Sequence, residues 1–153
     1  MAVVSKKSNL VTDRTLNIPN ADPEYVRGRP IAATGTVANA ADDSLGSTYH
    51  LVDIPAHAIL DSRTAFAVSN WGFATVQIGT LDDPDALASV LKSAGATVSP
   101  VAFGDVAKHG KPIWQVLGLA AEPKSGIVSL YAYGPAAATA AGTMLFEIHY
   151  RAR

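Results

Sequence analysis

Short strand-like runs divide the chain from residue 31 to its end, and this pattern constrains the fold more than any other feature. Residues that favour strands dominate each run, and glycine or proline marks off most of them. The runs cover residues 47–54, 59–69, 73–78, 127–133 and 143–151. We therefore expect a mainly β fold, an antiparallel β-sandwich of the jelly-roll type with one or two short helices in its loops.

The last run shows the clearest two-residue period. Successive side chains of a strand point to opposite faces, so alternate residues share a face. One face would carry Met144, Phe146, Ile148 and Tyr150, and the other Leu145, Glu147, His149 and Arg151. The first set is expected in the core, and the second faces solvent or a partner.

Two segments carry helix signals. Asp83 suits an N-cap, Pro84 suits the first helical position, and Leu87, Val90 and Leu91 follow at helical spacing, which predicts a helix ending at Gly95. A shorter helical turn is expected over 112–117, before a glycine. The alanine-rich segment 134–142 lies between two strands, and we interpret it as a hairpin loop.

The 153 residues suffice for one domain, with different character at its beginning. Residues 1–30 are polar and interrupted by prolines, so we expect an extended N-terminal arm, with a solvated terminus as the alternative. The β-sandwich domain would then span residues 31–153. Spaced apolar residues in the arm are candidate contacts with a neighbouring molecule: Leu10, Leu16, Ile18 and Tyr25.

The composition limits the partners. Twelve basic and thirteen acidic residues leave no positive excess for nucleic acid, and no apolar run is long enough for a membrane span or signal peptide. Cysteine is absent, which excludes disulfides, Cys-based zinc sites and thiol catalysis. Charged residues make up 16% and hydrophobic residues 48%, so we expect a soluble protein that hides part of its surface by self-association.

No pattern of catalytic residues stands out. The histidines at 50, 57, 109 and 149 lack the close spacing of zinc ligands, and no nucleophile elbow or phosphate-binding loop occurs. Helix capping accounts for Asp83 and Asp85 without a bound ion. We therefore expect no enzyme activity, no metal and no cofactor.

The run at 127–133 offers a candidate interface. If Val128 and Leu130 face the core, Ile127, Tyr131 and Tyr133 point outward together, which is more typical of an interface than of a solvated sheet. Trp71 is a further candidate for the same surface. The alternative is a sandwich that buries both faces of this strand.

Four segments carry distinctive motifs: STYHLVDIPAHA at 47–58, VQIGTLDDPDAL at 76–87, KPIWQVLGL at 111–119 and GTMLFEIHY at 142–150. Together they resemble small virion proteins of tailed bacteriophages that are encoded near the major capsid protein. The similarity covers about residues 31–150, and its motifs are structural rather than catalytic.

This resemblance implies a capsid decoration or cement protein with a jelly-roll-like sandwich and no catalytic residues. Its expected partners are the major capsid protein and further copies of itself, as a homotrimer first and a dimer second. Its expected location is the capsid surface of the virion, after assembly in the host cytoplasm. The alternatives are a neck or tail-completion protein and a cupin- or lectin-like sandwich that binds a small molecule.

Overall fold

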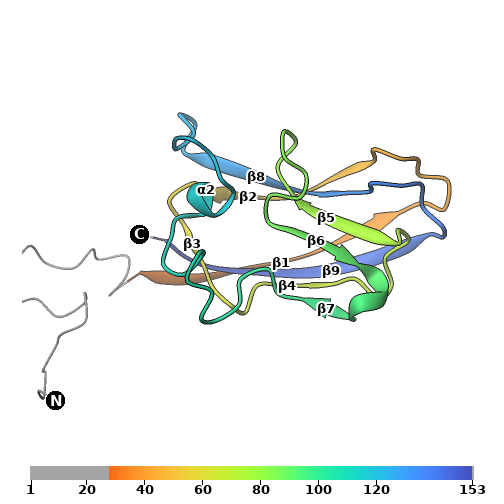
Figure 1. Cartoon of the computed structure of the whole chain (residues 1–153), viewed down its shortest axis with the longest axis horizontal. Coiled ribbons are helices and arrows are strands. Elements are labelled where there is room, and N and C mark those ends of the chain that lie inside the picture. Colours follow the sequence, from red (N-terminus) through yellow and green to blue (C-terminus); the bar gives the residue numbers. More distant parts are fainter. Residues whose placement is uncertain (1–27, 153) are drawn as a thin grey trace, which may run out of the picture.

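Two antiparallel sheets form the molecule in a computed structural model, which describes residues 28–152 (Figure 1). The first sheet has the order β1-β9-β4-β7, and the short β3 also pairs with β9. The second has the order β2-β8-β5-β6. The strands are β1 (Arg29–Asn39), β2 (Thr48–Pro55), β3 (Ile59–Leu60), β4 (Ala65–Ala67), β5 (Thr75–Gly79), β6 (Ala88–Leu91), β7 (Thr97–Val98), β8 (Ile127–Tyr133) and β9 (Gly142–Ala152).

The strand order is that of a jelly roll. Four antiparallel pairs nest inside one another along the chain: β1 with β9, β2 with β8, β4 with β7, and β5 with β6. This is one long hairpin whose tip is the β5–β6 turn. Pairing of β9 with β4 and of β8 with β5 rolls the hairpin into two sheets. The predicted fold class is therefore confirmed.

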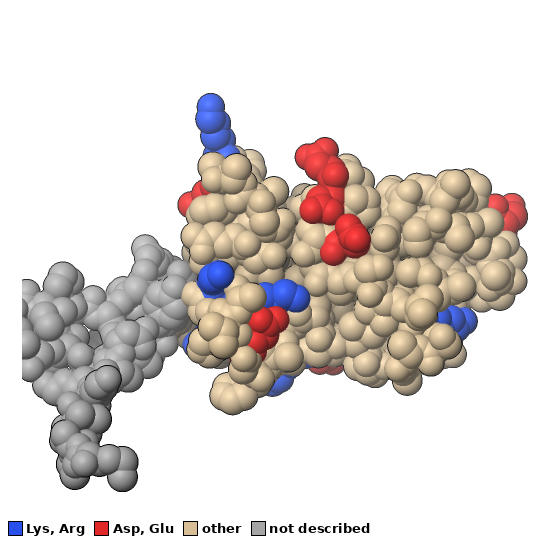
Figure 2. Space-filling view, in the orientation of Figure 1, with Lys and Arg blue, Asp and Glu red and all other residues tan. Residues whose placement is uncertain are grey.

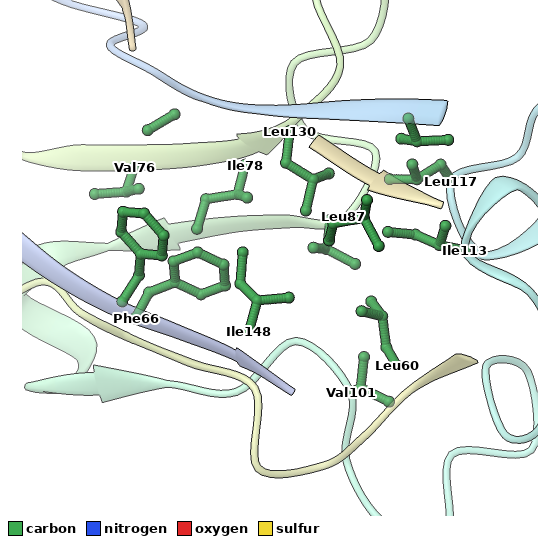
Figure 3. Close-up of a cluster of buried hydrophobic side chains, with 14 of the residues drawn as sticks. Leu60, Phe66, Val76, Ile78, Leu87, Val101, Ile113, Leu117, Leu130 and Ile148 are labelled. Atoms are coloured by element: carbon green, nitrogen blue, oxygen red, sulfur yellow. The ribbon is translucent and has the colours of Figure 1, made fainter. Parts of the chain in front are cut away.

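The core lies between the sheets and follows the predicted alternation. Met144, Phe146 and Ile148 of β9 are buried, and so are Val128 and Leu130 of β8. Figure 3 shows how side chains from both sheets and from the loops point toward one another. Its labelled residues are Leu60, Phe66, Val76, Ile78, Leu87, Val101, Ile113, Leu117, Leu130 and Ile148.

The predicted helix over 83–95 is wrong. Residues 80–87 form the tip of the long hairpin, and β6 follows, paired with β5 through Ala88 opposite Ile78. The amide of Asp83 donates a hydrogen bond to the Thr80 hydroxyl oxygen at 3.1 Å, so Asp83 ends a turn instead of capping a helix. Only Lys92–Ala94 is helical, as the single 3₁₀ turn η2. Strand pairing along β5 outweighs the local helix signals.

The other local predictions fare better. The expected helical turn is confirmed as α2 (Ile113–Val116), which packs Ile113 and Leu117 into the core. Segment 134–141 is a loop as expected, but it connects β8 of one sheet with β9 of the other and closes no hairpin. The run at 59–69 is divided into β3 and β4 by a turn in which the Thr64 amide donates to the Asp61 carbonyl.

The predicted domain boundary shifts slightly, because β1 already begins at Arg29. Most of the predicted arm, including its candidate residues Leu10, Leu16, Ile18 and Tyr25, lies outside the described residues. Within residues 28–152 the helices are three and four residues long, and none could cross a bilayer.

Candidate functional site

The outward face of β8 is arranged as predicted. Ile127 is half exposed, and Tyr131 and Tyr133 are partly exposed, while Val128, Leu130 and Ala132 are buried. Tyr131 is not free on both sides of its ring, because the His50 imidazole of β2 stacks on it with centroids 4.8 Å apart and planes at 22°. The candidate surface of the second sheet, formed by Ile127, Tyr131 and Tyr133, therefore also includes the polar ring of His50.

Trp71 does not belong to this surface, which corrects the sequence prediction. Its side chain is fully buried, with its ring 5.0 Å from that of Tyr49 in an edge-to-face contact and 5.6 Å from that of Phe73. Its indole Nε1 has no hydrogen-bond partner within the described residues. The neighbouring Gly72 has no room for a side chain, since a Cβ there would lie 1.9 Å from the Ala140 carbonyl oxygen.

A polar cluster lies next to the aromatic pair. The Ser129 hydroxyl donates to Oδ1 of Asp53 at 2.6 Å, and Nε2 of His50 lies 2.9 Å from the same oxygen. These two hydrogen bonds, the one from Ser129 first, lower the pKa of Asp53. A nucleophilic serine needs its hydroxyl on the histidine nitrogen, whereas here both groups bind the carboxylate. The cluster orders the sheet surface and does not activate Ser129.

Other polar groups are scattered. Nε2 of His149 lies 3.0 Å from a Glu147 carboxylate oxygen on the outer face of β9, and Arg63 pairs with Asp61 at 3.0 Å. Across residues 28–152 no three His, Asp or Glu side chains come together in a group that could hold a metal ion.

Acidic residues gather at the β5–β6 turn. Figure 2 shows them as a protruding group on a face that otherwise carries few charges. The side chain of Asp85 hydrogen-bonds to Asp83, and this contact is the largest cause of the raised pKa of the Asp83 carboxyl.

The most exposed apolar side chains belong to the loop 99–111, which sequence reasoning missed. Phe103 is 89% exposed and Val106 is 88% exposed. Each of these residues lies in a turn closed by a backbone hydrogen bond. The Asp105 amide donates to the Ala102 carbonyl around Phe103, and the His109 amide donates to the Asp105 carbonyl at 2.8 Å around Val106. The apolar residues beside Gly104, in a segment without strand alternation, were the available signal.

The side chain of Lys108 supports the shape of this loop. Nζ of Lys108 donates to the Pro100 carbonyl at 2.7 Å, which closes the loop across its base. The loop lies at the end of the sandwich where β1 begins, and α2 lies at the same end (Figure 1). The structure thus presents two apolar side chains on an ordered projection.

A shallow groove of about 560 Å³ crosses the outer face of the first sheet. One row of side chains runs across four strands: Thr36, Leu145, Ala67 and Thr97. The side chains of Thr36, Ala67 and Thr97 are short, so they leave a hollow beside Leu145, which is 55% exposed. The sequence had placed Leu145 on the outward face of its strand, and the structure shows the groove that surrounds it.

The comparisons with known proteins identify no relative. No protein-family model, no curated protein and no solved structure matches the chain.

Proposed function

We propose that the chain is a structural protein of a tailed-phage virion that binds the outer capsid surface and stabilises the shell. The jelly-roll sandwich supports this proposal, because it agrees with the fold that the motif resemblance over residues 31–150 implies. The observation that carries it is the ordered loop with Phe103 and Val106 almost fully in solvent.

Exposed apolar side chains on an ordered loop favour a protein partner. Burying a Val or Phe side chain is worth about 1.5–3 kcal/mol, and these two are ready to be buried together. The turns that hold the loop reduce the entropy lost on binding. A protein that makes such contacts only with the assembled shell stabilises that shell by mass action.

The test is binding to particles of the phage that encodes the chain. The double variant Phe103→Ser/Val106→Ser should bind at least tenfold more weakly than wild type in a co-sedimentation assay. The matched control is Leu45→Ser, because Leu45 is 65% exposed in the β1–β2 loop at the other end of the sandwich. We expect this control to bind like wild type.

Imaging of the native particle tests the location. Density for the sandwich at every capsomer supports decoration of the shell. Copies confined to one vertex would instead assign the chain to the neck or tail. Absence of the chain from purified particles would refute the virion role altogether.

A further inference from the structure

The open edge of β1 borders the groove of the first sheet. Within the described residues, β1 pairs with β9 alone, over eleven residues and without a bulge. From Pro30 to Asn39 the strand carries no charge. Natural edge strands are normally protected by charges, prolines, bulges or a short length, and beyond Arg29 and Pro30 at its start β1 has none of these. Its edge is therefore suited to pairing with another strand.

Among residues 28–152, nothing covers the surface beside this edge either. Thr34 and Thr36 of β1 form one wall of the groove, and Leu145 and Glu147 of β9 lie next to them. An extended segment placed here could add main-chain hydrogen bonds along β1 and set apolar side chains beside Leu145, which is how strand addition normally gives both affinity and specificity.

The sequence supplies such a segment ahead of β1. Residues 1–27 precede the described chain, and a stretch of that length reaches up to about 90 Å when extended. Within it, residues 11–18 contain the strand formers Val11, Thr12, Thr15 and Ile18, and Pro19 ends the run.

We propose that residues 11–18 of a second copy lie in this groove alongside β1. Pro30 restricts Arg29 to extended backbone, so the chain enters β1 along the strand axis, and the groove lies farther along β1, around Thr34 and Thr36. Reaching the groove of the same molecule would require a full reversal before Arg29. Reaching the groove of a neighbour requires none.

Disulfide trapping tests this contact, because the natural chain has no cysteine. A copy with Leu16→Cys is mixed with a differently tagged copy carrying Leu145→Cys and oxidised. The matched control receiver is Leu91→Cys, since Leu91 on the second sheet is 58% exposed against 55% for Leu145. We expect a cross-linked pair of twice the chain mass, at least tenfold more abundant with Leu145→Cys than with Leu91→Cys.

A second measurement separates binding from folding. One copy again carries Leu16→Cys, and the receiver copy now carries Ala67→Cys. Adding Leu145→Lys to this receiver should lower the yield of the cross-linked pair at least tenfold, whereas adding Leu91→Lys should not. Both lysine variants should keep the urea midpoint of their parent. A single chain carrying both Leu16→Cys and Leu145→Cys tests for linkage within one molecule. The proposal would be overturned by equal yields with both receivers, by no cross-linked pair, or by linkage only within this doubly substituted chain. Because no particle is used, these outcomes are independent of the capsid role.

Discussion

Asn39 at the end of β1 joins three loops of the sandwich, and its removal is the sharpest test of the packing. Its Nδ2 donates to the Ala140 carbonyl at 2.9 Å and to the Ala40 carbonyl at 2.8 Å, and its Oδ1 accepts from the Gly72 amide at 2.9 Å. The side chain is only 6% exposed. Asn39→Ala therefore leaves the buried Gly72 amide without its partner.

The expected loss follows from these contacts. An unsatisfied buried donor costs about 1–3 kcal/mol, and the lost bond to Ala140 adds about 0.5–1.5 kcal/mol. Water can replace the bond to Ala40, which is exposed. We expect the free energy of unfolding to fall by about 2–4 kcal/mol, which lowers Tm by roughly 4–16 °C in a domain of this size.

Urea unfolding followed by tryptophan fluorescence measures this loss, since the buried Trp71 adjoins Gly72. The control is Ser47→Ala, which removes an exposed hydrogen bond from Oγ to the Ser44 carbonyl and should cost less than about 0.5 kcal/mol. A loss for Asn39→Ala as small as that of the control would refute the reasoning, because it would mean that water reaches the Gly72 amide.

The variant Asn39→Asp tests the hydrogen bond that Asn39 accepts separately from those that it donates. The variant keeps the oxygen that binds the Gly72 amide but places a carboxylate against the Ala140 carbonyl. Burial and this contact raise the pKa of the introduced group in the folded state. Its destabilisation should therefore be greatest at neutral pH and should diminish as the pH falls and the group takes up a proton. A pH-independent difference from wild type would contradict this.

Four further predictions concern other parts of the chain. Burial, and then the hydrogen bond to Asp43, raise the pKa of Tyr49 to about 12, while the same bond lowers that of Asp43 from 3.8. Because the Asp43 pKa is lower in the folded state, ionised Asp43 stabilises the fold above pH 3.8, and this contribution is lost as the pH falls through the lower folded value. The difference in the free energy of unfolding between wild type and Tyr49→Phe should therefore narrow in acid. A difference that stays constant with pH in urea melts would exclude this coupling. Tyr131→Asp should dissociate a wild-type oligomer in analytical ultracentrifugation at micromolar concentration, at a cost of about 2–4 kcal/mol per desolvated site; a monomeric wild type would refute the oligomer, and an unchanged variant would refute this choice of face. Deleting residues 1–27 should leave a folded sandwich by circular dichroism but weaken particle binding; failure to fold would make the segment part of the core. A metal assay and a broad hydrolase screen should both be blank, and a stoichiometric transition metal would contradict this.

Local patterns in the sequence were enough to predict the long strands. The bounds of β8 agree with the prediction, and those of β2 and β9 agree to within a residue at each end. Alternation along β8 and β9 also predicted which side chains enter the core and that Ile127 faces outward. Both inferences depend only on the two-residue period of a strand and on glycine or proline at its ends, which are properties of neighbouring residues.

The tertiary structure decided what depends on distant partners. Residues 88–91 became a strand because β5 offered an edge, although their spacing favoured a helix. Trp71 is buried, with the rings of Tyr49 and Phe73 packed against its indole. The groove around Leu145 exists because short side chains from three other strands meet beside it. None of these outcomes is encoded locally, since each arises where segments separated in sequence come together when the hairpin rolls into two sheets.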